Sequence, residues 1–437
     1  MLSLLKQINN FIWGLPLLLL LLFTHLFFTL RLGFIQKKVF LGIKESVRPD
    51  DSGHGDLSGF AALATTLAAT LGTGNIVGVS TAVALGGPGA IFWCWITGIL
   101  GMATTYAESY LSILFRKKTS DGTYLGGPMY MLQDGLKKRG LALFYAVCTL
   151  GASFGVGCTT QSNAITQTTT RLWNWSPYLV GFIVAIPIGL IIIGGIKKIG
   201  NACTKLVPAM GFFYITGCII ILFMNISLLP KAVELILRAA FSPTAISGGI
   251  IGGTLQTAAR YGIARGLFTN EAGLGTAGIA AASAKSTYPE RQALISMTAT
   301  FWDTVVMCAI TGIVIIVGLL NNPLAPYSYG IGELTSAAFN QLPYGQTILG
   351  VSLISFAVAT LIGWSYFGEK ATDYLFGKKM ISLYHFLYIV MIYVGAVISL
   401  DLVWELTDFI NALMSIPCII ALFMLHKLLK TPENRRH

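Results

Sequence analysis

Eleven long apolar runs, separated by short segments that carry most of the charge, constrain this chain more than any other feature of its sequence. The runs span roughly 11–30, 57–81, 89–115, 141–169, 177–195, 206–226, 245–266, 292–320, 342–367, 380–399 and 404–426. About 20 such residues are enough to cross a bilayer as a helix. Only 11% of all residues are charged, whereas about a quarter are charged in a typical soluble domain. The sequence therefore predicts an all-α polytopic membrane protein with about 11 transmembrane helices.

Positive charges are distributed unevenly between these runs. Most of the 29 Lys and Arg residues lie in six alternate segments, which are 31–56, 116–140, 197–205, 285–291, 369–379 and 427–437. The other intervening segments hold only Lys6, Arg171, Lys231 and Arg238. Because cytoplasmic loops carry the excess of Lys and Arg, we expect a multi-pass protein of the cell membrane (plasma or inner membrane). Its N-terminus would lie outside and its C-terminus in the cytoplasm, as eleven spans require.

No catalytic or metal-binding motif accompanies the runs. All seven cysteines lie in apolar segments, without CxxC spacing or a nearby histidine, so neither a disulfide framework nor a metal site is expected. The sequence contains no HExxH, no Walker motif and no nucleophile with a nearby base. We therefore expect no enzyme and no cofactor, and the only partners we expect are the lipid bilayer and small solutes, with no nucleic acid and no soluble protein.

Two of the runs are interrupted where a membrane helix should be strongest. The second run contains Gly72-Thr73-Gly74-Asn75, and the seventh continues into RGLFTNEAGLGTAG, where Asn270 and Glu271 precede a glycine-rich stretch. A broken helix leaves N–H and C=O groups that lipid cannot satisfy, whereas a bound solute and ion can. Close helix packing through small residues is the alternative explanation for GTGN, but the matching second interruption favours a binding site.

Five spans separate the two interruptions, so the helices that carry them would cross the membrane in opposite directions. Paired breaks in two inverted halves are typical of secondary transporters. We expect a first five-helix repeat over 57–226 and a second, inverted repeat over 245–426, joined by an external interfacial linker, 227–244. An N-terminal helix and cytoplasmic loop (1–56) would precede them, with its apolar run retained because it is too long for a signal peptide. A cytoplasmic tail (427–437) would follow.

The residues around the interruptions resemble the alanine or glycine:cation symporter family. The resemblance extends from about residue 55 to about residue 426, and its motifs are GTGNIVGVSTAVALGGPGAIFWCWITGILGMATTYAE, GGPMYML, GGIKKIGNACTKLVP, RGLFTNEAGLGTAGIAAASAK and GWSYFGEK. It implies two inverted five-helix repeats of the LeuT type after one extra helix. It also implies sodium-coupled symport of a small neutral amino acid, alanine or glycine, into the cell.

The resemblance also implies which residues bind the substrate. Carried over by position, these are Thr73, Gly74, Asn75, Gln161, Phe268, Ala272, Thr360 and Trp364. The first break would hold the carboxylate, the Phe268 carbonyl would accept from the ammonium, and Trp364 would limit the side chain. A different neutral amino acid such as glutamine remains an alternative, because pocket volume cannot be read from the sequence.

For the coupling ion, the resemblance implies a sodium site made by the carbonyls of Ala68 and Leu71 with oxygens of Asn75 and Thr360. Ala359 stands where a second hydroxyl residue would commonly precede Thr360, which removes one possible ligand. Hard cations need several oxygens, so proton-coupled symport stays open as an alternative to sodium coupling.

Four other polar residues lie within or directly after the runs. We expect Glu271 to be structural, accepting hydrogen bonds from the re-started helix or pairing with Arg265, although proton coupling would make it functional. Glu108 would face cytoplasmic water. Asp303 either contributes to ion binding or links two helices. Asn163 either faces the cavity or points to a different side of its helix.

Overall fold

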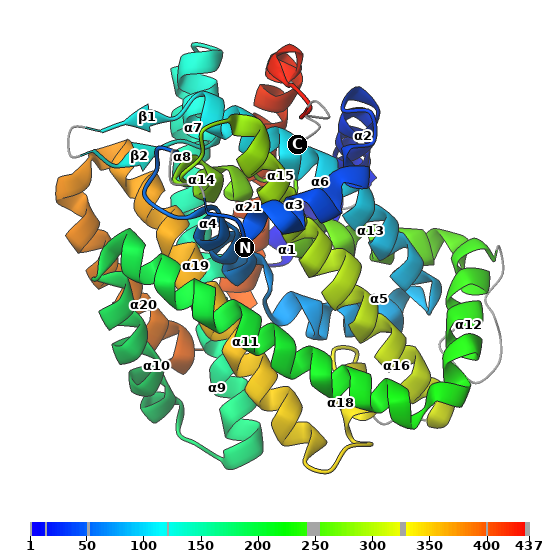
Figure 1. Cartoon of the computed structure of the whole chain (residues 1–437). Coiled ribbons are helices and arrows are strands. Elements are labelled where there is room, and N and C mark those ends of the chain that lie inside the picture. The colour runs from blue at the N-terminus through cyan, green and yellow to red at the C-terminus, as the bar shows by residue number, and fades with distance from the viewer. Residues whose placement is uncertain are drawn as a thin grey trace.

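The structure is a computed structural model that describes residues 2–13, 15–49, 53–119, 122–242, 254–323, 329–398 and 401–432. Nearly all of these residues form helices (Figure 1), and the paired strands among them are β1 (Lys117–Lys118) and β2 (Tyr124–Leu125), an antiparallel hairpin. Within the described ranges, 7 helices are long and apolar enough to cross a membrane, or up to 9 if each bent pair counts as one span. The all-α, multi-pass prediction is therefore confirmed. The count of eleven stays a prediction, since the run 245–266 begins outside the described residues.

The N-terminal part contains two helices rather than one span over 11–30. They are α1 (Leu2–Ile12) and α2 (Leu15–Arg31), and a 3-10 turn η1 (Ile35–Lys38) and α3 (Val39–Ser46) follow. The chain bends by 68° after α2, where Gly33 and Phe34 both adopt left-handed φ values of 60° and 59°. Helix α3 then packs against α15 (Pro289–Thr300), at a point where a Cβ on Gly42 would lie 2.4 Å from the Leu294 carbonyl oxygen.

The first predicted interruption is present. Helix α4 (Gly59–Thr70) begins at Ser58, whose hydroxyl accepts from the Ala61 N–H at 3.1 Å, as a good N-cap does. It stops before the 3-10 turn η2 (Thr73–Asn75), and α5 (Val77–Gly86) continues at an angle of 62°. The glycines on either side of Thr73 therefore mark a real break.

The second interruption is also present. Helix α13 (Leu255–Asn270) ends where Glu271 takes a left-handed φ of 53°, and α14 (Thr276–Ala282) begins after Gly273 and Gly275, with φ values of 98° and 89°. Glycine adopts such values without a steric cost, so the GLG sequence allows the chain to turn here.

The remaining helices complete a bundle around the two broken ones. From the first half these are α6 (Gly89–Leu114), α7 (Pro128–Tyr130), π turn η3 (Met131–Gly135), α8 (Arg139–Phe154), π turn η4 (Gly155–Thr159), α9 (Thr160–Trp173), α10 (Pro177–Ile192), α11 (Gly195–Met224), η5 (Ile226–Leu228) and α12 (Leu229–Phe241). From the second half they are α15, π turn η6 (Phe301–Cys308), α16 (Ala309–Asn321), α18 (Leu334–Phe339), α19 (Gly345–Phe376), η7 (Lys378–Met380), α20 (Ile381–Val397), α21 (Asp401–Leu425) and η8 (His426–Leu428). Two of the π turns, η4 and η6, lie inside long spans. A π turn inside a helix frequently marks a functional site.

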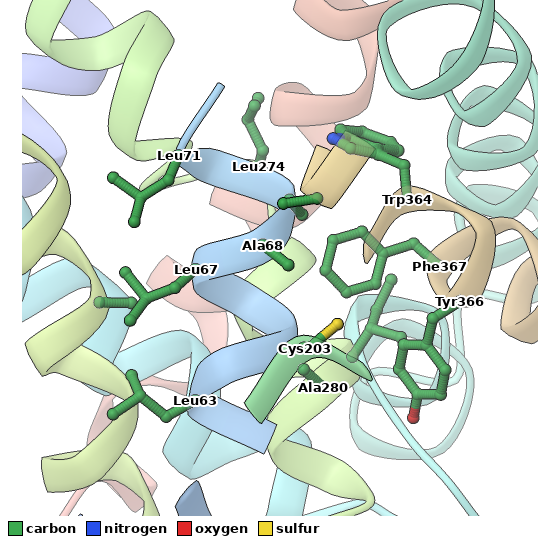
Figure 2. Close-up of a cluster of buried hydrophobic side chains, with 14 of the residues drawn as sticks. Leu63, Leu67, Ala68, Leu71, Cys203, Leu274, Ala280, Trp364, Tyr366 and Phe367 are labelled. Carbon is green, nitrogen blue, oxygen red and sulfur yellow. The ribbon is translucent and has the colours of Figure 1, made fainter. Parts of the chain in front are cut away.

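Helix α4 lies in the centre of the core. Figure 2 shows Ala68 of α4 facing Phe367 of α19, whereas Leu63, Leu67 and Leu71 point to the other side of α4, and all five side chains are buried. Helix α19 approaches α4 closely at Gly363, where a Cβ would lie 2.6 Å from the Ala69 backbone nitrogen. Small residues at such crossings let the helix backbones approach each other.

Candidate functional site

A pocket of about 370 Å³ lies beside both breaks. Its wall is formed by Trp13, Ala69, Thr70, Gly72, Thr73, Gly74, Val77, Gly78, Thr81, Ala82, Val156, Thr160, Gln161, Tyr261, Ala264, Arg265, Phe268, Thr269, Glu271, Thr360 and Asp408. These residues come from the two broken helices, from α9, α19 and α21, from the π turn η4, and from Trp13 directly after α1. The two predicted breaks therefore share one cavity.

At the first break, Thr73 and Gly74 line the pocket, but the Asn75 side chain points into the protein and is fully buried. Its Oδ1 accepts from the Gly72 N–H at 3.0 Å, and its Nδ2 donates to Asp303 Oδ1 at 2.7 Å. Asn75 thus satisfies a backbone group that the break leaves open, and it reaches Asp303 rather than the pocket.

Asp303 lies in the π turn η6, and its side chain has no exposed surface. Besides Asn75, it accepts from the Thr304 hydroxyl at 2.7 Å, and Thr304 lies 3.4 Å from the hydroxyl of Thr269, a pocket residue. Both donors are neutral, and none of the ion pairs within the described ranges includes Asp303. Asp303 therefore does join two helices, through neutral partners only.

At the second break, the Glu271 carboxylate accepts from the Thr276 hydroxyl at 2.7 Å, at the start of α14. Glu271 also lines the pocket, and no ion pair with Arg265 occurs in the described structure. Glu108 was expected to face cytoplasmic water, and that prediction is wrong. It is fully buried, and its carboxylate accepts from the Gly273 N–H, because the turn of the second break leaves this amide without a helical partner.

Gln161 lines the pocket from α9. Its amide nitrogen donates to the Val156 carbonyl at 3.1 Å, while its buried oxygen has no partner within the described residues. An unpaired buried acceptor is costly, so this oxygen is suited to an ammonium donor. Asn163 lies elsewhere, donating to the Gly395 and Ile398 carbonyls.

Thr360 brings α19 to the end of α4. Its hydroxyl donates to the Phe356 carbonyl at 3.1 Å and lies 3.5 Å from the Leu71 carbonyl oxygen. Both Leu71 and Ala68 are buried behind the pocket wall. Two members of the expected cation site, Leu71 and Thr360, are therefore in contact.

Trp364 does not line the pocket, although it lies one helical turn from Thr360. Trp364 is fully buried, and its ring centroid lies 5.5 Å from that of Phe367. It also packs against the π turn η4, where a Cβ added to Gly157 would lie 2.2 Å from the Trp364 Cβ. Ala272 is also buried away from the cavity, and its N–H donates to Asn270 Oδ1 at 3.0 Å.

Of the residues expected to bind substrate, Thr73, Gly74, Gln161, Phe268 and Thr360 thus share the pocket, whereas Asn75, Ala272 and Trp364 lie behind its wall. Their binding roles stay predictions. The pocket is also lined by residues that the sequence did not predict there, which are Trp13, Tyr261, Thr269 and Asp408. Arg265 and Glu271, which the sequence suggested as a possible pair, both line the pocket.

On the side of the protein away from the pocket, residues 54–57 contact residues 283–286. His54 pairs with Ser286 and Leu57 with Ala284 as isolated β-bridges, and the Arg116 guanidinium donates to the carbonyls of His54 (2.9 Å) and Ala284 (2.8 Å). The starts of α4 and the segment after α14 are therefore held together on the side away from the pocket.

Known proteins show which family has this arrangement. The crystal structure of MhsT in complex with L-phenylalanine has a TM-score of 0.61 at 14% identity, covering 85% of this chain and 89% of that one, so the two share a fold. The sodium/alanine symporter AgcS of Methanococcus maripaludis is 45% identical over 432 residues, 97% of this chain and 94% of that protein. A probable sodium/glutamine symporter of Bacillus subtilis, GlnT, is 36% identical over 433 residues, 97% of this chain and 88% of that protein. The model of the sodium:alanine symporter family matches residues 1–434. This chain therefore belongs to the sodium:alanine symporter family.

Proposed function

We propose that this protein carries alanine or glycine into the cell together with sodium. The observation that carries the proposal is the pocket shared by the two helix breaks, with polar side chains such as Thr73, Gln161 and Thr360 in its wall. Half-helix N-termini favour a carboxylate, and freed carbonyls favour cations. The substrate carboxylate would lie against Thr73 and Gly74, and its ammonium against the Gln161 oxygen and the Phe268 carbonyl.

Sodium would bind behind the substrate, where the Leu71 carbonyl and the Thr360 hydroxyl lie 3.5 Å apart. The carbonyl of Ala68, one turn earlier in α4, would add a further oxygen. Asp303 would supply negative charge through its hydrogen bond to Asn75. A buried carboxylate surrounded by neutral donors is costly in a membrane, and a nearby cation would offset that cost.

The test is uptake by purified protein in liposomes. Labelled alanine is supplied under an inward sodium gradient and, separately, an equal potassium gradient, each with and without an inward proton gradient. Uptake that requires sodium supports the proposal. Uptake driven by protons alone would show that the proton, not sodium, is the coupling ion. Transport of glutamine but not of alanine would show that glutamine is the substrate.

Proton coupling is the second candidate, because Glu108, Glu271 and Asp303 are all buried and outside every ion pair within the described ranges. Buried carboxylates within membrane spans are typical of proton relays in transporters. The proton arm of the liposome experiment therefore separates the two candidates directly.

Replacing Thr360 with valine is expected to raise the sodium concentration for half-maximal uptake about tenfold or more, because a lost ligand weakens metal binding at least this much. The measurement is alanine uptake against sodium concentration at saturating alanine. Thr372→Val is the matched control, since the Thr372 hydroxyl makes the same bond within α19, to the Gly368 carbonyl at 2.8 Å. Equal sodium dependence in both variants would argue against a cation at Thr360.

The pocket would face outward in this structure. By the distribution of Lys and Arg, the contact between residues 54–57 and 283–286 lies on the cytoplasmic side, and it is closed. Alternating access through rocking of one set of helices against the other would require this contact to open, and Arg116 is the side chain that holds it.

Arg116→Gln is accordingly expected to favour the inward-facing state. A cysteine introduced at Ala284, which is fully buried, should then react with a maleimide about fivefold faster or more, because several charge-assisted hydrogen bonds are lost. All seven native cysteines are buried and make a low background. Lys117→Gln, which removes an exposed neighbouring charge paired with Asp134, should leave the rate unchanged. An unaltered rate in Arg116→Gln would show that this contact does not gate the inner side.

A further inference from the structure

The N-terminal helix α1 lies against α21 and is fastened to it by hydrogen bonds. Asn9, whose side chain is only 6% exposed, donates to the Glu405 carbonyl at 2.6 Å and to the Glu405 carboxylate at 2.8 Å. One turn later, the Trp13 indole nitrogen donates to the Asp408 carbonyl at 2.9 Å. A segment that precedes both predicted repeats is therefore anchored at two successive turns of the last long helix.

Trp13 also forms part of the pocket wall. Its ring packs edge-on against Phe268, with centroids 5.9 Å apart and planes at 62°, and the Arg265 guanidinium lies 5.1 Å from the centroid of the Phe268 ring. Edge-to-face aromatic pairs and a cation over an aromatic face are both favourable. The indole, phenyl and guanidinium groups therefore form one continuous row of contacts beside the second break.

This row of contacts makes Trp13 a rigid boundary. The indole cannot swing away without losing both its hydrogen bond to Asp408 and its contact with Phe268. Beside the first break, the Arg265 guanidinium occupies the space over Gly78, where a Cβ would lie 2.1 Å from its Cζ, so this part of the wall is also filled. The pocket volume of about 370 Å³ falls within the range that accommodates ligands larger than alanine.

We propose that Trp13 is a specificity-determining residue, through which α1 closes the pocket on the side of α13 and α21 and limits the length of the substrate side chain. This inference rests on the proposed amino-acid transport. It assigns the size limit to a residue outside both repeats, whereas Trp364, which was expected to set it, lies behind the wall.

The experiment compares Trp13→Ala and Trp13→Phe with the unmodified full chain in liposomes, measuring sodium-driven uptake of alanine, methionine and glutamine. We expect Trp13→Ala to raise the ratio of kcat/KM for methionine to that for alanine about tenfold or more, since side-chain discrimination in apolar pockets is of this size. For Trp13→Phe, this ratio should lie between that of Trp13→Ala and that of the unmodified chain. Trp173→Ala is the matched control, because Trp173 is 37% exposed and packs on Trp175 instead of the pocket. An unchanged ratio in Trp13→Ala would overturn the proposal.

A second measurement covers the case in which Trp13→Ala does not fold. In a Trp13→Cys variant, the introduced thiol should react with a membrane-impermeant maleimide added outside, and alanine with sodium should slow this reaction several-fold, because the occupied pocket covers position 13. The buried native cysteines give a low background. Absence of protection in a variant that still transports alanine would overturn the role of Trp13. Absence of alanine uptake by the unmodified chain would instead refute the proposed transport.

Discussion

Asp303→Asn is expected to reduce sodium-driven alanine uptake by an order of magnitude or more. The substitution preserves the size of the side chain but removes the negative charge that accepts from Asn75 at 2.7 Å and from Thr304 at 2.7 Å. Hydrogen bonds to charged groups contribute about 1.5–3 kcal/mol each, and the proposed cation loses its countercharge. The measurement is initial uptake as a function of sodium concentration, with the amount of folded protein determined by size-exclusion chromatography.

Two further variants make this result specific. Asp134→Asn removes a partly exposed carboxylate that pairs with Lys117 at 3.1 Å, and surface pairs of this kind contribute about 0–1 kcal/mol, so uptake should be unchanged. Asp303→Glu keeps the charge and should retain part of the sodium dependence. If Asp303→Asn transports alanine with the sodium dependence of the unmodified chain, Asp303 serves only to join two helices.

Gly363→Ala is expected to abolish uptake. The added methyl group would lie 2.6 Å from the Ala69 nitrogen and 3.0 Å from its Cα and Cβ, and these backbone atoms cannot move aside as the end of a flexible side chain could. Helices α19 and α4 would have to separate beside the contact between Thr360 and Leu71. Overpacking of a core costs about 1–3 kcal/mol, so we also expect a lower melting temperature.

The matched control is Gly211→Ala, because a Cβ at Gly211 in α11 would meet nothing within 4 Å. Alanine is favoured over glycine in a helix by roughly 0.5–1 kcal/mol, so this variant should transport normally and be slightly more stable. Normal transport by Gly363→Ala would mean that the spacing of α4 and α19 does not control the site.

The sequence was sufficient to predict the helical class and the position of both breaks, because these follow from local composition. An apolar run of span length forms a helix, and glycines within it weaken that helix, whatever the residues elsewhere in the chain. Sequence was not sufficient for residues 128–135, because a short apolar segment followed by Lys and Arg is equally compatible with an amphipathic helix on the membrane surface. There Met129, Met131 and Leu132 are instead fully buried, because other helices cover the short α7 and the turn η3.

The directions of individual side chains were less predictable, since they depend on residues far away in the chain. Asn75 points to Asp303, which is 228 positions away, and Trp364 packs into space that Gly157 leaves open. Neither partner is marked by spacing or by a motif. The contribution of Trp13 could not be anticipated at all, because it arises from the docking of α1 on α21, and an aromatic residue near a span end ordinarily indicates an interfacial anchor.

The hydrogen bond from the Gly72 N–H to Asn75 Oδ1 bears on the half of a transport cycle in which nothing is carried. A carrier must return empty after it has released its cargo, and a broken helix that depended on cargo for its hydrogen bonds would resist release and the return step alike. Here the protein itself satisfies this amide, and the Glu108 carboxylate does the same for Gly273 at the other break. The free energy of ligand binding is then left to discriminate and couple solutes, and the unloaded protein keeps its shape for the next cycle.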